Sequence, residues 1–239
     1  MAKIDKSLYT KEEWLVIRNR RRLDKQLKKQ KQQITQSMKN KDTKTAFVLG
    51  NGVSRASIDP EQLAKLGATY GCNALYRTFA PDYLIAVDVK MILEISRSGY
   101  PDRNTVWTNH NKAYTELKNI NYFQPSRGWS SVPTALAKAA DDKHKTIYIL
   151  GFDYMGLNGG KKFNNLFADT NNYKKSKEPA TYYGNWLRQT ESVIRTNTDT
   201  QFLRVTNVGD FCPAQLNSYD NIRNIDYDEL EFRLKKPHD

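Results

Sequence analysis

The sequence predicts an α/β fold: a mainly parallel sheet with helices on both faces, preceded by a basic helical arm. Two observations carry this prediction. From Thr45 onward, short apolar runs alternate with helical stretches of about 10–15 residues, which is typical of the βαβ units that build parallel sheets. Before that point the charge is one-sided, because residues 1–44 hold 14 Lys and Arg against 5 Asp and Glu. We therefore expect two parts, an arm over 1–44 and a folded domain over 45–239.

The composition sets the class of protein. A chain of 239 residues has room for one α/β domain and an appendage. Its apolar runs all fall short of the ~20 residues that cross a bilayer, and its first residues lack the apolar core of a signal peptide. Cys72 and Cys212 are too few and too far apart for a disulfide framework. We expect a cytoplasmic protein without a membrane partner.

The arm begins with a helix start signal. Thr10 and Glu13 have the spacing of a capping box, in which each side chain bonds the backbone amide of the other residue. No Pro or Gly interrupts the chain from there to about Met38, and residues 40–44 have the composition of a hinge. The apolar positions form a narrow, gapped stripe that cannot bury itself, so the helix lies on the body, on another subunit of a homo-oligomer, or on a polyanion. The side chains expected to contact a polyanion such as DNA are Arg18, Arg20, Arg21, Arg22, Lys25, Lys28 and Lys29.

The rest of the chain divides into strands and helices. The predicted strands are 45–49, 68–72, 83–87, 105–108, 120–123, 146–150 and 202–206. The predicted helices are 60–66, 89–97, 111–118, 131–141 and 183–196. Residues 156–180 form a long loop without periodicity, of a length typical of functional lids or disordered segments. The tail after Tyr219 alternates acidic with apolar residues and could supply an edge element.

The first apolar strand ends in a turn with the composition of a phosphate site. Gly50, Asn51, Gly52 and Ser54 follow it, and glycine allows a positive φ and the close approach of a ligand to the backbone. The amides of such a turn can hold a phosphate. It is not a Walker loop, and Arg55 stands where a Gly-x-Gly-x-x-Gly motif needs its third glycine. A plain strand-to-loop turn explains the same residues equally well.

Polar residues follow other strands as well. Asn73 ends the second strand, where its amide could pair with a base or ribose edge, or form a turn. Asp88 ends the third strand, as a site carboxylate, as the N-cap of the next helix, or as both. Gly151, Asp153 and Tyr154 follow the most apolar strand, and a charge directly after so buried a strand favours a site. Because ligands of open α/β sheets bind where strands end at a switch point, we expect a Rossmann-like nucleotide-sugar site with Asp88 and Asp153 as catalytic candidates.

Two helix starts complete the candidate nucleotide site. Ser130 and Ser131 open a small-residue helix, where hydroxyls and free amides favour an anion, although an ordinary serine cap explains them too. Tyr182 and Arg188 lie at the start of an aromatic-rich helix, whose rings fit a plain core and whose arginine could instead face a phosphate or an acidic sugar. The histidines are scattered and no Asp-x-Asp occurs. We expect no metal, and no cofactor beyond a nucleotide-sugar donor that acts as substrate.

In order and spacing, Gly50 to Ser54, Asn73, Ser131 and residues 147–154 resemble the bacterial lipooligosaccharide sialyltransferases that use CMP-sugars. They also resemble the related motility-associated-factor and MptE-like domains. The resemblance covers about residues 45–206, and the full sequence also resembles uncharacterised proteins of T4-like tailed phages.

The resemblance implies site roles and one departure. It implies that the Gly50 to Ser54 turn lines the nucleotide phosphate and ribose, and that Asn73 and Ser131 also contact the nucleotide. In those transferases a histidine precedes a Tyr-x-Gly stretch and acts as the base, whereas Thr181 holds the matching position here. A general base must titrate near the working pH, so Asp88 or Asp153 would have to replace that histidine.

Two functions therefore compete. The first is a metal-independent glycosyltransferase in the host-cell cytoplasm, with the 156–180 loop closing over the donor and the arm holding an acceptor such as DNA with hydroxymethylated bases. The alternative is a non-catalytic phage virion or nucleic-acid-binding protein that retains the fold, which the missing histidine favours. An MptE-like pyrophosphokinase is disfavoured because the sequence offers no carboxylate cluster for Mg²⁺.

Overall fold

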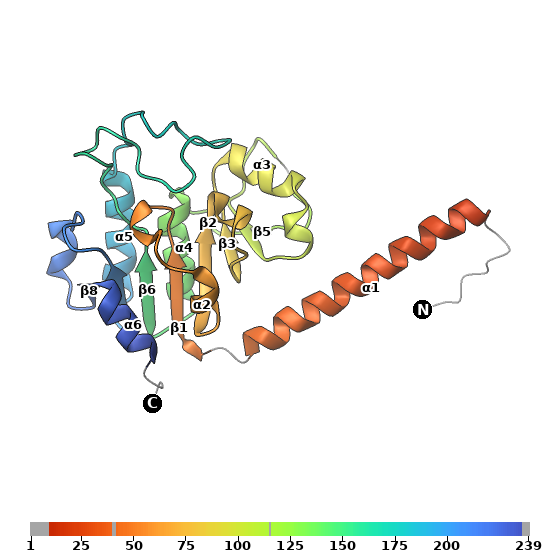
Figure 1. Ribbon diagram of the computed structural model, residues 1–239, viewed down its shortest axis with the longest axis horizontal. Helices are drawn as coiled ribbons and strands as arrows, with labels where there is room; N and C mark the ends of the chain where they lie inside the picture. The colour runs from red at the N-terminus through yellow and green to blue at the C-terminus, as the bar shows by residue number, and fades with distance from the viewer. Residues whose placement is uncertain (1–9, 40–41, 115, 236–239) are drawn as a thin grey trace. The chain divides into compact units, whose positions relative to one another are not determined.

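The computed structural model describes residues 10–39, 42–114 and 116–235. The chain divides into two compact units, residues 1–40 and residues 41–239. The first unit holds the arm helix α1 (Lys11–Lys39), and the second holds the sheet with its helices, the body (Figure 1). The strand β1 begins at Asp42, within the range predicted for the arm.

The body alternates strands with helices along most of its length. The strands are β1 (Asp42–Leu49), β2 (Gly67–Cys72), β3 (Tyr83–Ile85), β4 (Val106–Thr108), β5 (Asn121–Tyr122), β6 (Thr146–Leu150), β7 (Gln201–Val205) and β8 (Ile222–Ile225). The α-helices are α2 (Pro60–Ala64), α3 (Val89–Arg97), α4 (Ser131–Asp141), α5 (Gly184–Thr196) and α6 (Tyr227–Lys235). The short 3₁₀ turns are η2 (Val53–Arg55), η3 (Asn73–Arg77), η4 (Tyr100–Asp102) and η5 (Ala214–Ser218).

The eight strands form one sheet in the order β5-β4-β3-β2-β1-β6-β7-β8, and every neighbouring pair is parallel. The chain first adds β2 to β5 on one side of β1 and then crosses to add β6 to β8 on the other side. The order therefore reverses between β1 and β6, where Leu49 pairs with Leu150. This is the topological switch point at which open α/β sheets bind ligands, and the predicted Rossmann-like fold is confirmed.

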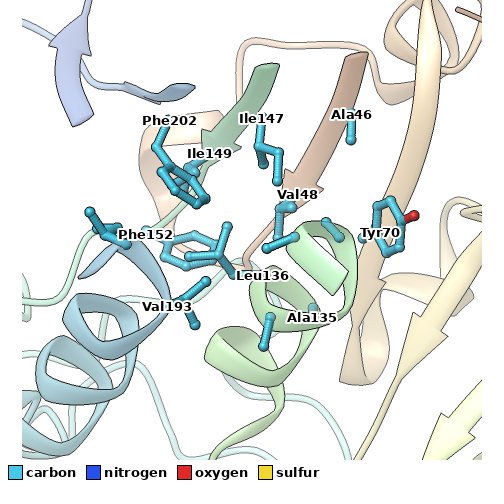
Figure 2. Close-up of a cluster of buried hydrophobic side chains, with 14 of the residues drawn as sticks. Ala46, Val48, Tyr70, Ala135, Leu136, Ile147, Ile149, Phe152, Val193 and Phe202 are labelled. Carbon is cyan, nitrogen blue, oxygen red and sulfur yellow. The ribbon is translucent and has the colours of Figure 1, made fainter. Parts of the chain in front are cut away.

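Both faces of the sheet are buried, because alternate residues of each central strand point to opposite sides. On one face, Ala46 and Val48 of β1 and Ile147 and Ile149 of β6 pack against α4 and α5 (Figure 2). On the other face, a second cluster joins the intervening residues to helices α2 and α6; its buried members include Phe47, Leu49, Leu63, Tyr148, Leu150 and Leu230. A third cluster covers the far strands with α3.

One predicted helix is wrong. The described residues of 111–118 form turns and an isolated bridge between Asn111 and Tyr114. The Asn111 side chain accepts a bond from the Ala113 amide at 2.9 Å, and the Tyr114 hydroxyl donates to the Asn109 carbonyl at 2.8 Å. Local side-chain bonds of this kind compete with the helix.

Other elements extend the prediction. The tail after Tyr219 supplies β8, an edge strand of the sheet, and then the helix α6. Residues 156–180 form the expected long irregular loop, which Figure 1 shows beyond the carboxyl ends of the strands (teal). This loop is tied to the body, since the Leu166 amide donates to the Asn51 carbonyl at 2.8 Å. Arg77 in η3 donates to the Thr170 hydroxyl at 2.8 Å.

The arm helix begins with the predicted capping box. The Thr10 amide donates to Glu13 Oε2 at 2.9 Å, and the Glu13 amide donates to the Thr10 hydroxyl at 3.2 Å. Leu15, Val16 and Leu23 are exposed on the helix, so the side chains described on it, up to residue 29, form no core of their own. Such a helix depends on propensity, capping and a partner surface for its stability.

Candidate functional site

A cavity of about 360 Å³ opens at the carboxyl ends of the strands, across the switch point between β1 and β6. Its walls come from the ends of β1, β2, β3 and β6, from the starts of α4 and α5, and from the 156–180 loop. The predicted residues that line it are Asn51, Gly52, Asn73, Asp88, Ser130, Ser131, Gly151, Asp153 and Tyr154. Side chains that are far apart in the sequence thus meet where the topology expects a ligand.

The turns after β1 and β6 approach each other closely, and glycines make this approach fit. A Cβ at Gly50 would lie 2.5 Å from the Gly151 carbonyl oxygen, and a Cβ at Gly151 would lie 2.8 Å from the Gly50 carbonyl oxygen. Gly151 also has φ +68°, a conformation that favours glycine. A Cβ at Gly52 would lie 2.5 Å from the carboxylate oxygens of Asp153. Close packing of two strand ends is therefore a structural cause for these glycines.

Most amides of the turn after β1 already donate to protein acceptors. The amides of Gly50 and Gly52 donate to carbonyls at the end of β6, that of Val53 to Asn164 Oδ1 at 2.9 Å, and that of Ser54 to Asp153 Oδ2 at 3.0 Å. The Ser54 hydroxyl also donates to Asp153. A phosphate cradled by this turn would have to displace the side chains of Asn164 and Asp153.

Arg55, marked in the sequence only by a missing glycine, lies buried behind the turn. Its guanidinium donates to the Gly50 carbonyl and, at 3.2 Å, to Asn51 Oδ1. The Asn51 amide group donates to the Cys72 carbonyl at 3.1 Å. Asn51 therefore joins the ends of β1 and β2, and its side chain serves the fold. Burial lowers the pKa of Arg55, which keeps its positive charge at neutral pH.

The two predicted catalytic carboxylates have different surroundings. Asp153 is held by the amide and the hydroxyl of Ser54. Asp88 occupies the N-cap position of α3 but makes no side-chain bond to that helix. It lies at the mouth of the cavity, accessible to solvent, and the protein packed around its carboxylate partly desolvates it and raises its pKa. Asp88 is thus the carboxylate that is open to a ligand.

The start of α4 forms one wall of the cavity. Ser131 is buried and its hydroxyl accepts a bond from the Val87 amide at 3.1 Å, so this side chain ties α4 to the end of β3. Ser130 occupies the N-cap position without a side-chain bond to the helix. The first amides of a helix have no intrahelical partners and carry a partial positive charge. The wall at Ser131 and Val132 is therefore suited to an anion.

Two polar atoms at the cavity wall are buried without a well-formed hydrogen bond in the described residues: the Tyr154 hydroxyl and Asn73 Oδ1. The Tyr154 hydroxyl faces the side chain of Thr190, whose own hydroxyl donates to the Trp186 carbonyl at 2.9 Å. Both residues have positive φ, +58° for Tyr154 and +52° for Asn73, so each stands in a backbone conformation that non-glycine residues seldom adopt. Burial raises the pKa of Tyr154 to about 12, and its hydroxyl keeps its proton at neutral pH. A buried polar group without a partner costs free energy, which a bound ligand can recover.

The sequence did not identify Arg204 of β7, which is buried against the ring of Tyr154. Its guanidinium donates to the carbonyls of Phe152 at 3.1 Å and Phe211 at 2.9 Å, and it lies 5.3 Å from the centre of the Tyr154 ring. No ion pair joins it to a carboxylate within the described residues. The only sequence signal was an arginine inside an apolar strand.

The remaining predicted residues lie outside the cavity wall. Gly50 and Ser54 stand directly behind it, Tyr182 is 77% exposed, and Arg188 lines a separate hollow on the outer side of α5. Aromatic rings that the sequence did not single out line the cavity instead: Phe152, Phe163, Tyr173 and Trp186. On the arm, Arg18, Arg20, Arg21, Arg22, Lys25 and Lys29 are exposed on α1, and the side chain of Lys28 lies outside the described residues.

Comparisons with family models, with curated proteins and with solved structures find no match to this chain. Among the described residues, no helix has the length and apolar character to span a membrane. Nor do these residues contain a group of three or more His, Cys, Asp or Glu side chains placed to hold a metal ion.

Proposed function

We propose that the cavity binds a nucleotide-linked sugar and that the protein transfers this sugar to a hydroxyl acceptor. The observation that carries the proposal is the pair of unpartnered buried polar atoms, the Tyr154 hydroxyl and Asn73 Oδ1, beside the uncapped start of α4 at the switch point. These groups offer one donor, one acceptor and the two backbone amides of Ser131 and Val132, since Pro133 has no amide proton. A nucleotide carries the complements of all three.

Charge supports a phosphate as part of the ligand. Arg55 and Arg204 are buried on either side of the loop that begins at Gly151, and neither forms an ion pair with a carboxylate in the described residues. Buried charges act over longer distances than exposed ones because water screens them less. Together with the start of α4 they offset the charges of Asp88 and Asp153 on the cavity wall and so let the cavity accept an anion, while Asn73 is suited to a ribose or base edge.

Asp88 is the residue we assign as general base. It lines the cavity and also a second hollow of about 330 Å³, which shares Asn73, Asp88 and Tyr173 with it. The donor would occupy the cavity and the acceptor would enter by the second hollow. The acceptor hydroxyl would give its proton to Asp88 as its oxygen bonds the sugar carbon, and the bond from that carbon to the phosphate oxygen would break, leaving the charge on the nucleotide.

This assignment accounts for the missing histidine. Thr181, at the position that matches the transferase base, lines the cavity but has no group that titrates near neutral pH. The pKa of Asp88 is raised, which makes its carboxylate a stronger proton acceptor. Asp153 would support the site by holding the turn after β1.

Calorimetry with CMP, UDP and GDP tests the proposal. We expect at least one of them to bind the full chain, and Tyr154→Phe to weaken that binding about tenfold by removing one hydrogen bond to a charged ligand. Tyr100→Phe is the matched control, because it also removes a buried hydroxyl without a partner, but in η4 and outside the cavity. Asp88→Asn should keep nucleotide binding and abolish transfer. No binding of any of the three nucleotides would refute the proposal.

The alternative, a non-catalytic virion or nucleic-acid-binding protein, is favoured by one observation: the basic arm forms a unit of its own. DNA is the partner we propose for the arm under either function, since Lys and Arg contacts to phosphates give sequence-independent, salt-sensitive affinity. Deleting residues 1–40 should abolish salt-dependent retention on double-stranded DNA. Retention with the same salt slope would instead make the arm a protein-docking element.

A further inference from the structure

A second polar hollow lies on the outer side of α5, here called the α5 hollow. It has a volume of about 450 Å³ and is lined by Trp129, Arg188, Gln189, Glu191, Ser192, Arg195 and Tyr219. Residues 188, 192 and 195 are spaced by four and three positions, which places them on one face of the helix. Leu187, Val193 and Ile194 are buried in the core of the body, so the α5 hollow faces away from that core.

The α5 hollow combines positive charge with aromatic surface. Arg188 donates to Asn185 Oδ1 at 2.9 Å, a neutral acceptor on the same helix, and neither Arg188 nor Arg195 forms an ion pair within the described residues. The one carboxylate present, Glu191, accepts the Tyr219 hydroxyl at 2.7 Å. Two guanidinium groups without ion pairs in the described residues therefore stand beside the rings of Trp129 and Tyr219. A third, that of Arg127, is paired with Asp141 and lies 5.5 Å from the centre of the Trp129 ring, so a stacked ligand ring is expected on the other face of the indole.

We infer that the α5 hollow binds a nucleotide unit of a single-stranded nucleic acid. A base has two faces for stacking, and an indole or phenol ring is a suitable platform for it. A phosphate accepts the paired donors of a guanidinium group. An indole and two unpaired arginines in one hollow match a unit that carries both a base and a phosphate. A free nucleoside monophosphate has the same chemistry, and the test separates these two sources.

The α5 hollow is distinct from the cavity at the switch point. The two have no lining residue in common, and the link between them is the Ser130 amide, which donates to Gln189 Oε1 at 3.1 Å. The inference does not depend on sugar transfer. A strand bound in the α5 hollow would lie next to the start of α4, where Ser130 lines the cavity.

Fluorescence anisotropy of a labelled oligothymidylate with the full chain tests the inference. We expect the double variant Arg188→Ala, Arg195→Ala to bind about tenfold more weakly. Its salt slope should fall by about 0.7, since the bound unit brings one phosphate and each phosphate contact on a single strand contributes about 0.7. Arg97→Ala with Arg103→Ala is the matched control: it removes two exposed arginines outside the α5 hollow, and affinity should stay within about twofold.

The stacking half of the inference has its own variants. Trp129→Ala should weaken binding about fivefold or more, and Trp129→Phe should restore most of it, because phenylalanine keeps an aromatic face. Competition with thymidine monophosphate at the same sites would show that the isolated unit suffices, and no competition would show that a strand is required. Equal losses in the two arginine pairs, or wild-type affinity in the Arg188 and Arg195 variant, would overturn the inference.

Discussion

Buried polar groups near the two ends of the sheet differ in their hydrogen bonding. Near the amino ends of the strands, the Tyr70 hydroxyl contacts Asp142 Oδ2 at 2.6 Å and His144 Nε2 at 2.9 Å. His144 Nδ1 donates to the Thr43 carbonyl at 2.8 Å, and Lys138 pairs with Asp142. At the carboxyl ends, the Tyr154 hydroxyl and Asn73 Oδ1 have no such bonds within the described residues.

This difference in hydrogen bonding separates an end of the sheet that stabilises the fold from the end that lines the cavity. A polar group that is buried and fully bonded adds to stability and fixes the packing around it, as Tyr70 does between β2 and the turn that follows α4. A buried group without a partner lowers stability and persists where something else compensates for it. The amino end at Tyr70 is therefore closed by the protein itself. The unpartnered atoms at the carboxyl end line the cavity, which sets them apart from the Tyr100 hydroxyl and Trp107 Nε1, buried without hydrogen-bond partners elsewhere in the described residues.

We expect the largest effect from adding a methyl group where the turns after β1 and β6 approach each other. Gly151→Ala places a Cβ at φ +68° and 2.8 Å from the Gly50 carbonyl oxygen, so the two turns must move apart. We expect the free energy of unfolding in urea to fall by about 2–4 kcal/mol. Gly159→Ala is the matched control, because it has φ +66° but no atom within 4 Å of the added Cβ, and it should lose only about 1–2 kcal/mol. Equal losses would show that close packing of the turns contributes nothing.

A pair of tyrosine variants tests the comparison of the two ends directly. Tyr70→Phe removes a hydroxyl with two partners and should lower the free energy of unfolding by about 1–3 kcal/mol. Tyr154→Phe removes a hydroxyl without a protein partner, so stability should stay within about 0.5 kcal/mol or rise. Urea unfolding of both variants in the absence of nucleotide measures this. A loss at Tyr154 as large as that at Tyr70 would mean that both ends are closed.

The closed parts of the molecule were the easier ones to predict from the sequence. Apolar runs such as 46–49 and 147–150 predict buried strands. The residues at the strand ends pointed to one site, and Asn73, Asp88, Asp153 and Tyr154 do line one cavity. The helix predicted over 111–118 failed because its Asn111 bonds its own backbone, a local event that periodicity does not register.

The sequence could not predict how deeply a side chain is buried or which way it points. Arg55 and Arg204 are ordinary arginines in the sequence, and their burial follows only from the packing of the turns around them. Arg188 was expected in the nucleotide site, yet the helix turns it outward to the α5 hollow. Which polar atoms of the cavity remain unpaired depends on the packing of several segments around them, and this cannot be read from single positions.

The smallest effect is a difference between two titrations. Asp88 has no ion pair with a cation among the described residues and is partly desolvated, so its pKa lies above the ordinary aspartate value of about 3.9. By contrast, the Arg233 guanidinium beside Glu229 lowers the pKa of that carboxyl below its ordinary value of about 4.3. For Asp88 the sign follows from the native state holding its proton more tightly: its contribution favours folding below the unfolded pKa and is lost as the pH rises through the folded one. Glu229 acts in the opposite sense, favouring folding above its unfolded pKa. Carboxyl ¹³C chemical shifts followed from pH 2 to pH 8 measure both pKa values, with Asp88→Asn to assign the signal.

A pKa of Asp88 at or below about 3.9 would show that its carboxylate is not destabilised by desolvation, and would remove it as the candidate base.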